Sequence, residues 1–445
     1  MNENIFKAYD IRGIFPTEIN EKAVYKIAQA YGAWLKPKKV AVGRDVRNSG
    51  EILNKSVIEA LIEMGIDVVD IGVATTDMLY FAVAHYKLDG GICVTASHNS
   101  AEYNGLKLVR EKASPVSLDS GLDKIRDLVR KNEVSKSENK GEIEQRDVSE
   151  DYLAKVLSFI EKEKIKPMKV VANPNFGASG KIVEKIAEVL KIDLIKLNFE
   201  QNGNFPKGKP DPLMLTNQKE ISELVKKSRA DFGVAWDADA DRCFFFDEKG
   251  SFIPAYYTTA ILAKIVLKGN RGSVVVQDPR LVWASRDAVL EMGGATVRSK
   301  AGRSFIGETM RKEDAIFAGE ISGHYFFRDF FACDNGIIPF LIMLQYLSET
   351  EQTLSEVTDP YFKMYPISGE LNFKVNDVNQ ILEKIKAEYR DGELDDIDGI
   401  SISFDDWRFN IRSSNTEPLL RLNVEAIEKK VLDEKVTELT KLIEE

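Results

Sequence analysis

The sequence is poor in cysteine and proline and has no long apolar run. Its 445 residues include only 14 prolines and three cysteines, which lie far apart and show no C-x-x-C spacing. Neither a zinc knuckle nor a disulfide framework is therefore expected, and a reducing cytoplasm fits best. No segment approaches the roughly 18 apolar residues that a membrane span needs, and the start of the chain lacks the apolar core of a signal peptide. We expect a protein that is neither anchored in a membrane nor exported.

The sequence also lacks an excess of positive charge. Lysine and arginine total 61 against 71 aspartate and glutamate residues, which gives a net charge of -10. Broad binding to nucleic acid or to an anionic membrane is therefore not expected, and an anionic ligand must find a local basic site. The share of hydrophobic residues, 44%, and of charged residues, 30%, is that of a globular protein. The length predicts two to four compact units, at roughly 100 to 200 residues per domain.

Three segments repeat the order strand, helix, strand. In each, a short apolar run precedes an amphipathic helix, and a second apolar run follows it. The segments cover residues 38–71, 169–197 and 272–298. They predict three related α/β domains with mixed, partly parallel sheets flanked by helices. After about residue 365 the pattern changes to short strands with two helices, which predicts a smaller C-terminal α+β domain.

A charged segment with few apolar residues, 131–147, indicates an exposed stretch at the first domain boundary. Functional side chains are expected in loops that leave strand ends, because open α/β sheets expose backbone amides and side chains together there. Four such loops stand out, one in each predicted domain. The predicted domains are residues 1–147, 148–250, 251–364 and 365–445.

The first loop follows an apolar run and reads Thr95, Ala96, Ser97, His98, Asn99. Ser97, at a strand end, is a candidate covalent nucleophile. A serine hydrolase pair with His98 is disfavoured, because adjacent side chains rarely point the same way and the G-x-S-x-G motif is absent. An ordinary capping turn remains the alternative for this loop.

The second loop carries Asp237, Asp239 and Asp241 between two apolar runs. Alternate residues of an extended segment point to one side, so the three carboxylates would repel one another unless a cation joins them. Three oxygen ligands, with room for water and a phosphate oxygen, suit Mg²⁺. An EF-hand is disfavoured because Arg242 stands where that loop needs glycine, and Asp241 breaks the D-x-D-x-[TV] motif of haloacid-dehalogenase-type phosphotransferases. A solvated acidic turn remains the alternative.

The third and fourth loops offer groups for a polar ligand. Glu320 and Ser322 stand two residues apart after an apolar stretch, a spacing suited to adjacent sugar hydroxyls. In the last domain a guanidinium is followed by hydroxyl and amide donors, an arrangement that resembles a phosphate-binding nest. A polar or capping turn is the alternative in both places. The fourth loop consists of Arg412, Ser413, Ser414, Asn415, Thr416 and Glu417.

Together with an opening K-A-Y-D-I-R-G stretch at Lys7 to Gly13, these loops resemble, in order and over the whole length, the motifs of the α-D-phosphohexomutase superfamily. The chain is most similar to phosphomannomutase/phosphoglucomutase. The resemblance implies four domains with the active site in the cleft between them, a phosphorylated Ser97, and Mg²⁺ bound by Ser97 with the three aspartates of the second loop. It further implies sugar contacts from Glu320 and Ser322 and phosphate contacts from Arg412, Ser414, Asn415 and Thr416.

The implied reaction interconverts hexose 6-phosphate and hexose 1-phosphate, of mannose and/or glucose, through hexose 1,6-bisphosphate, which also acts as activator. Arg12, Lys107 and Arg242 would neutralise the charge of the transferring phosphoryl group. The proton of the attacking hydroxyl would be handled near Lys107, Arg12 and His324. The only partner expected is a phosphosugar, and the protein would be a monomer or a homodimer.

Some residues depart from the family pattern. Ala238 and Ala240 stand where the metal loop often has glycine or a bulkier residue, and alanine there would be strained only at positive φ. Arg280 and Arg303, also expected to bind substrate, stand where phosphomannomutase relatives often carry lysine and histidine. A guanidinium does not reproduce the geometry of either group, so these positions affect the preferred sugar.

Three other functions remain as alternatives. A phosphoglucosamine mutase usually has glutamine where Ile321 stands. A metal-dependent sugar phosphatase would not need the second phosphate site around Arg412. A catalytically silent sugar-phosphate-binding protein would not need Ser97 together with three aspartates.

Overall fold

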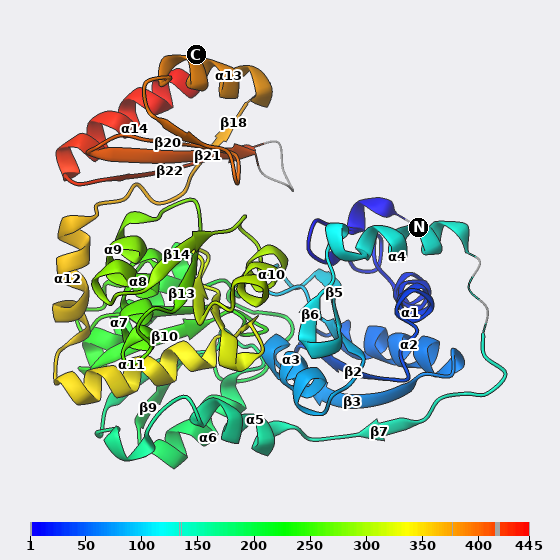
Figure 1. Cartoon of the computed structure of the whole chain (residues 1–445). Helices are drawn as coiled ribbons and strands as arrows, with labels where there is room; N and C mark the ends of the chain where they lie inside the picture. Colours follow the sequence, from blue (N-terminus) through cyan, green and yellow to red (C-terminus); the bar gives the residue numbers. More distant parts are fainter. Residues whose placement is uncertain (1, 133, 135, 376, 414–418, 445) are drawn as a thin grey trace. The chain divides into compact units, whose positions relative to one another are not determined.

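The structure is a computed structural model that describes residues 2–132, 134, 136–375, 377–413 and 419–444. Four β-sheets follow one another along the described chain, and Figure 1 shows helices beside each of them. Three sheets mix parallel and antiparallel strands and the last is antiparallel, which confirms the predicted fold class. None of the described helices is both long and apolar enough to cross a membrane.

The first sheet has the order β1-β5-β4-β2-β3-β7, and β6 pairs with the C-terminal end of β5. Its central strands are parallel and β5 is antiparallel to β4. Because parallel strands are buried on both faces, β4 reads as a continuous apolar run. Its elements are β1 (Ile11–Ile14), α1 (Glu21–Leu35), β2 (Lys39–Arg44), α2 (Gly50–Glu63), β3 (Asp67–Val73), α3 (Thr76–His85), β4 (Gly90–Val94), β5 (Tyr103–Arg110), β6 (Ser114–Pro115), α4 (Leu122–Lys131) and β7 (Ile143–Gln145).

The predicted exposed segment 131–147 also contributes a strand to this sheet. Within it, β7 pairs in parallel with β3, and Ile143 lies opposite Val68. Ile143 is 51% exposed, so β7 is an edge strand held by backbone hydrogen bonds more than by burial. The three residues of β7 are exposed or half-buried, as expected for this segment, and an exposed edge strand needs no apolar run in the sequence.

The second and third sheets repeat the β-α-β pattern. Their orders are β12-β11-β10-β8-β9 and β14-β13-β15-β16-β17. Along the chain, the elements up to the last strand of the second sheet are α5 (Ser149–Leu157), β8 (Lys169–Asn173), α6 (Gly180–Leu190), β9 (Asp193–Lys196), α7 (Leu215–Ser228), β10 (Phe232–Trp236), β11 (Cys243–Phe246) and β12 (Phe252–Ile253). They are followed by α8 (Ala255–Leu267), β13 (Val274–Gln277), α9 (Trp283–Glu291), β14 (Ala295–Arg298), α10 (Arg303–Glu313), β15 (Phe317–Gly319), β16 (Tyr325–Phe327), β17 (Cys333–Asp334), α11 (Ile337–Thr350) and α12 (Leu354–Met364).

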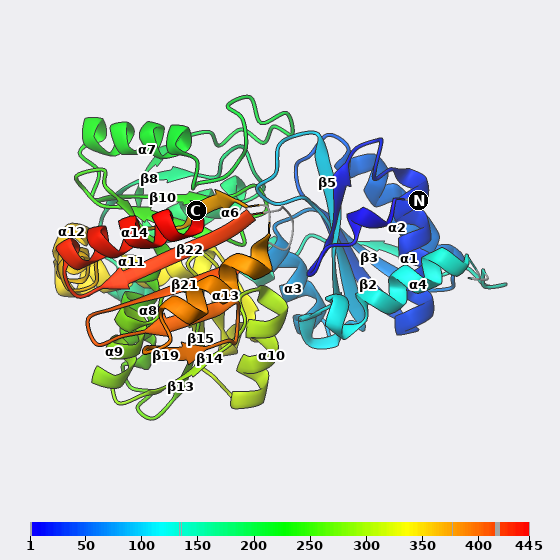
Figure 2. The same ribbon diagram turned by 90° about the horizontal axis from the view of Figure 1, so that it is seen from above.

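The fourth sheet has the order β18-β22-β21-β20-β19, and both of its helices lie on the same face (Figures 1 and 2). Alternation along the strands sends apolar side chains such as Phe409 and Leu422 into a core shared with those helices. The intervening residues, among them Arg408 and Arg412, point to the opposite face. The elements are β18 (Leu371–Lys374), α13 (Val378–Glu388), β19 (Glu393–Asp395), β20 (Ile400–Ser403), β21 (Trp407–Ser413), β22 (Leu419–Ala426) and α14 (Lys429–Glu444).

The chain divides into two compact units. The first holds residues 1–252 and 324–354, and the second holds residues 253–323 and 355–445. The division into four domains at residues 147, 250 and 364 stays a prediction.

Candidate active site

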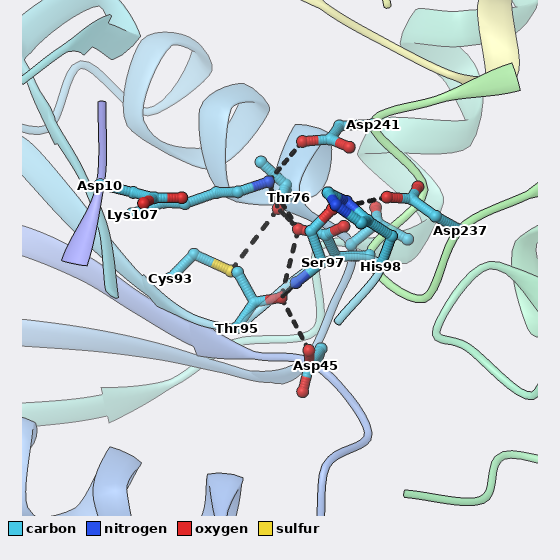
Figure 3. A network of polar contacts seen from close by, with 12 residues as sticks. Asp10, Asp45, Thr76, Cys93, Thr95, Ser97, His98, Lys107, Asp237 and Asp241 are labelled. Atoms are coloured by element: carbon cyan, nitrogen blue, oxygen red, sulfur yellow. Dashed lines mark hydrogen bonds and ion pairs between the residues drawn. The ribbon is translucent and has the colours of Figure 1, made fainter. Parts of the chain in front are cut away.

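Ser97 lies directly beyond β4 and is buried, with 2% of its surface exposed. Its Oγ donates a hydrogen bond of 2.6 Å to Oδ2 of Asp237, and its backbone N–H donates to Oγ1 of Thr95 at 2.9 Å. Its φ is +50°, a left-handed conformation that costs roughly 1–2 kcal/mol for a residue other than glycine. Figure 3 shows the hydroxyl directed at the acidic loop that follows β10. Strain at a buried hydroxyl of this kind is typical of a functional site.

His98 points the same way as its neighbour, contrary to the reasoning from the sequence. Its Nδ1 lies 3.3 Å from Oγ of Ser97, because the left-handed backbone at Ser97 turns the two side chains together. Burial, followed by the charges of Arg242 and Arg12, lowers the pKa of His98 well below its usual value and keeps the ring neutral. The Ser97 hydroxyl nevertheless donates to Asp237, so the arrangement is not that of a hydrolase Ser–His pair.

The acidic loop brings three carboxylates together in a turn. Asp237, Asp239 and Asp241 are buried, and one oxygen from each lies within 4.8 Å of the others. The expected extended segment is wrong: the loop bends, the N–H of Ala240 donates to the carbonyl of Asp237 at 3.1 Å, and Ala240 has a φ of +57°. The strain considered for alanine in this loop therefore applies at Ala240, where glycine would be free of it.

Lys107, on β5, provides the positive charge among these carboxylates. Its Nζ donates to Oδ2 of Asp239 at 2.6 Å and to Oδ2 of Asp241 (Figure 3). Burial opposes ionisation of Asp241, but Lys107 and then His324 outweigh it and hold the pKa of Asp241 well below its usual value. Burial, reinforced by Asp241 and Asp239, raises the pKa of Asp237 well above its usual value. One cation therefore does not neutralise the whole cluster.

The donor set fits a hard divalent cation. Oδ1 of Asp239 and Oδ1 of Asp241 are buried and accept no hydrogen bond among the described residues. Carboxylate and hydroxyl oxygens are the ligands that Mg²⁺ prefers, and the Ser97 hydroxyl touches the same cluster. A second possible group, Asp241 with His324 and Asp334, shares Asp241 with the first and adds a nitrogen ligand. The all-oxygen cluster is the better match for Mg²⁺.

The remaining predicted basic residues of the first unit lie around this cluster. Arg12, on β1, donates from Nη1 to Oδ1 of Asn99 at 2.7 Å, which places it beside the Ser97 loop. Nε of Arg242 lies 3.9 Å from Oδ2 of Asp237. Nε2 of His324 lies 3.5 Å from Oδ1 of Asp241. The structure thus brings together all eight predicted site residues of this unit, with Lys107 at the centre.

The second unit gathers a different set. Arg280 is buried, and its Nε donates to both oxygens of Asp278 at 2.8 and 2.9 Å. Its Nη2 lies 3.5 Å from Oε1 of Glu320, which accepts a 2.8 Å bond from the N–H of Gly302. Arg303 follows as the first residue of α10 and is buried.

The loop of Glu320 turns back on itself. The N–H of Gly323 donates to the Glu320 carbonyl at 3.0 Å, and Ser322 lies within this turn. Arg412 is the penultimate residue of β21 and lies two residues before the part of the fourth loop that the structure does not describe. The predicted phosphate contacts Ser414, Asn415 and Thr416 lie outside the described residues.

Models of all four domains of one protein family match the chain in order. Alpha/beta/alpha domains I, II and III of phosphoglucomutase/phosphomannomutase match residues 3–136, 150–250 and 254–365, and the C-terminal domain matches residues 370–442. The chain belongs to the phosphoglucomutase/phosphomannomutase family. The resemblance inferred from the motifs is confirmed.

Known members of the family resemble the chain over nearly its full length. A phosphomannomutase of Vibrio cholerae is 44% identical over 98% of this chain and 98% of its own. A phosphomannomutase of Escherichia coli K12 is 43% identical, with 95% and 94% covered. A solved structure of a phosphoglucomutase/phosphomannomutase family protein from Burkholderia thailandensis superimposes with a TM-score of 0.90 at 28% identity and covers 99% of this chain and 97% of that one.

In this member of the phosphoglucomutase/phosphomannomutase family, a buried ion pair holds the Ser97 loop by hydrogen bonds to its backbone, and sequence reasoning missed it. Arg47 is buried, pairs with Asp45 at 3.1 Å and donates to the carbonyls of Ser97 and Asn99 at 2.7 and 2.6 Å. Asp45 in turn accepts a 2.7 Å bond from Oγ1 of Thr95. A signal was present, because Asp45 directly follows β2, whose end lies beside the end of the parallel strand β4. The strand-end rule that selected four loops also applies here.

Two further groups position the acidic loop. Thr76, at the start of α3, donates from Oγ1 to Oδ2 of Asp239 at 2.6 Å and from its N–H to the Asp239 carbonyl at 2.9 Å. Gly177 lies so close to Ala238 that a Cβ would approach its backbone oxygen to 2.5 Å, so only glycine fits there. Neither residue belongs to a motif, and only the tertiary structure reveals these contacts.

A second buried ion pair holds the backbone of Arg280. Arg408, on β21, is buried and donates to the carbonyls of Arg280 and Pro279 at 3.1 and 3.0 Å. It also pairs at 2.8 Å with Glu425, which accepts the N–H groups of Val282 at 2.8 Å and Trp283 at 3.1 Å. Moving the loop of Arg280 would break the hydrogen bonds that Arg408 and Glu425 make to it. It would leave buried charged groups without partners, so the loop is held firmly.

Proposed function

We propose that this family member is a phosphohexomutase that interconverts hexose 6-phosphate and hexose 1-phosphate of mannose and/or glucose. The observation that carries the proposal is the buried Ser97 hydroxyl, 2.6 Å from one of three clustered aspartates. Relatives 41–44% identical over nearly their full length bear the names phosphomannomutase or phosphohexose mutase, which supports the same activity.

In the proposed reaction, phosphorylated Ser97 transfers its phosphoryl group to a hydroxyl of the hexose monophosphate. The resulting hexose 1,6-bisphosphate reorients, and its other phosphate returns to Ser97. Mg²⁺ held by Ser97, Asp237, Asp239 and Asp241 would neutralise charge on the transferring group. Lys107 adds positive charge beside Asp239, and Arg242 adds it beside Asp237. Arg12 lies next to the Ser97 loop.

The residues around Ser97 have separate roles in this scheme. Arg47 holds the Ser97 loop by its carbonyls, so the hydroxyl stays directed at the acidic cluster. The proton of the attacking sugar hydroxyl would leave near Lys107, Arg12 or His324. His324 lies beside the acidic cluster, with its Nε2 3.5 Å from Oδ1 of Asp241.

The second unit would bind the parts of the substrate that do not react. Glu320 and Ser322 would contact sugar hydroxyls, and Arg280, Arg303 and Arg412 would bind substrate, with Ser414, Asn415 and Thr416 completing the phosphate contacts. Support comes from the concentration of guanidinium groups around Arg280 and Arg412 in a chain of net negative charge. Activation by hexose 1,6-bisphosphate, a monomeric or homodimeric state and a cytoplasmic location stay predictions.

A coupled assay tests the proposal. Mannose 1-phosphate, glucose 1-phosphate and glucosamine 1-phosphate are each supplied with Mg²⁺ and a trace of the matching bisphosphate, and formation of the 6-phosphate is followed. We expect turnover with mannose and/or glucose 1-phosphate and little with glucosamine 1-phosphate. Release of inorganic phosphate instead of the 6-phosphate would identify a phosphatase, and preference for glucosamine 1-phosphate would identify a phosphoglucosamine mutase.

A further inference from the structure

Two arginines face each other on neighbouring strands of the fourth sheet. In the antiparallel register of β21 and β22, Arg412 lies directly opposite Arg421. Their neighbours along the strands, Ile411, Leu420 and Leu422, enter the core beneath α13 and α14. Both arginine side chains therefore belong to the opposite face of the sheet. Like charges directly opposite one another destabilise a sheet, so this pair needs an anion.

Glu370 supplies that anion within the protein. It directly precedes β18, the strand next to β22. Its Oε1 lies 3.3 Å from Nη1 of Arg421, and its Oε2 lies 3.8 Å from Nη2 of Arg412 and 3.9 Å from Nη1 of Arg280. One carboxylate therefore lies within ion-pair distance of three guanidinium groups that come from three separate segments.

The three contacts of Glu370 are longer than the 2.8 Å ion pair between Arg408 and Glu425. Good N–H···O hydrogen bonds measure about 2.7 to 3.2 Å, and all three distances to Glu370 exceed that range. Nε of Arg412 and Nε of Arg421 are buried and have no hydrogen-bond partner among the described residues. By contrast, Arg408 is hydrogen-bonded to Glu425 and to two carbonyl groups. Arg412 and Arg421 thus each keep a buried donor that no group among the described residues accepts, and Arg408 does not.

The neighbouring pair of residues in the register of β21 and β22 also has buried polar atoms without hydrogen-bond partners among the described residues. Asn410 and Asn423 also lie opposite each other on β21 and β22, next to the arginine pair and on the same face. Both are fully buried, and Oδ1 and Nδ2 of Asn423 have no hydrogen-bond partner among the described residues. Unpartnered polar atoms are uncommon in a buried position, so this pair adds unsatisfied hydrogen-bonding groups next to the arginine pair.

We infer that Glu370 is an internal counterion that competes with the phosphate of the substrate for Arg412 and Arg421, and that Arg421 is a further phosphate-binding residue. The inference rests on the proposed function, because it takes a phosphomonoester as the ligand. A dianionic phosphate offers three oxygens to the guanidinium groups, where the carboxylate offers two and one negative charge. The side chain of Glu370 is 28% exposed, so it can turn to solvent when phosphate arrives. Between turnovers it offsets the repulsion within the arginine pair.

Affinity measurements on Glu370→Gln test the competition. Calorimetric titrations use inorganic phosphate and, in a Ser97→Ala background that prevents turnover, mannose 1-phosphate. Removing the competing charge should tighten the binding of both ligands by about tenfold. Arg421→Gln should weaken both by about tenfold, because one charge-assisted contact is lost. Glu393→Gln, an exposed change on β19 in the same sheet, is the matched control and should leave both affinities unchanged.

Thermal unfolding separates competition from a purely structural role. Without ligand, Glu370→Gln should unfold at a lower temperature than the wild type, and added phosphate should raise its Tm by more. A lower Tm with unchanged or weaker phosphate affinity would overturn the inference and leave Glu370 as a structural counterion. If none of these proteins bound mannose 1-phosphate, the proposed substrate would be wrong, and the inorganic phosphate series would still decide the role of Glu370.

Discussion

The two units collect opposite charges. Around Ser97 the first unit concentrates aspartates and provides Lys107 as the central cation, so the cluster needs more positive charge. Around Arg412 the second unit concentrates guanidinium groups and offsets them with carboxylates such as Glu370. A phosphate can be bound through a metal in the first region and directly by arginine in the second. Under the proposed function, phosphoryl transfer takes place in the first region and the second region holds the substrate.

If this assignment is correct, removal of the metal should have the largest effect. Treatment with EDTA should reduce mutase turnover below detection, because Asp237, Asp239 and Asp241 would repel the incoming phosphate. Turnover is measured before and after chelation, and addition of Mg²⁺ serves as the control by restoring it. Undiminished turnover in metal-free buffer would show that Lys107 alone is sufficient in the first region.

Loss of the Ser97 hydroxyl should rank second. Ser97→Ala should reduce turnover by at least about a thousandfold with little change in substrate affinity, because the group that accepts the phosphoryl is gone. Intact-mass spectrometry should find one phosphate on the wild type after exposure to bisphosphate and none on the variant. Circular dichroism provides the control for folding. Near-normal turnover of a folded variant would contradict the role of Ser97 as nucleophile.

Changes in the second region should act on binding. Arg412→Ala should raise KM by about ten- to a hundredfold, since a charge-assisted contact contributes roughly 1.5–3 kcal/mol. Turnover should also depend more strongly on added bisphosphate, because the intermediate escapes more often. Phosphorylation of Ser97 by saturating bisphosphate should persist. An unchanged KM together with unchanged dependence on bisphosphate would break the proposed division of roles.

The last prediction concerns the pH dependence of the stability of the first unit and not its turnover. Burial raises the pKa of Asp77, on α3, to about 7, although Thr75 and Tyr152 donate hydrogen bonds to it. The unfolded chain releases this proton near pH 4, so the folded state binds more protons between about pH 4 and 7. The stability that Asp77 contributes is therefore complete below about pH 4 and is lost as the pH rises to 7, by at most about 4 kcal/mol.

Asp77→Asn should remove this part of the pH dependence. Urea unfolding of the wild type and the variant at pH 5 and pH 8 measures the difference in their free energies of unfolding. Relative to the wild type, the variant should be more stable at pH 8 than at pH 5. Asp119→Asn, an exposed change in the same unit, is the control. Parallel pH profiles for the wild type and Asp77→Asn would show that Asp77 stays ionised in the folded protein.

The position of the site could be predicted because loops at strand ends are visible as polar residues after apolar runs. Ser97 and the three aspartates were found in this way, and the structure places them together. Arg47 and Arg408 were not found, since they act through backbone carbonyls of other segments and carry no motif of their own. The turn at Ala240 was also missed, because alanine rarely adopts a positive φ.

By itself, the sequence determined the order of strands and helices, the apolar runs that become buried strands, and the chemical type of each loop. The tertiary structure decided which charges meet. Lys107 lies 132 residues from Asp239 in the chain. Glu370 directly precedes β18, which lies beside the strand of Arg421 only because of the order of the fourth sheet. Local periodicity records which face of a strand is buried, whereas strand order and register set the neighbours of its polar face, and these depend on contacts between distant segments.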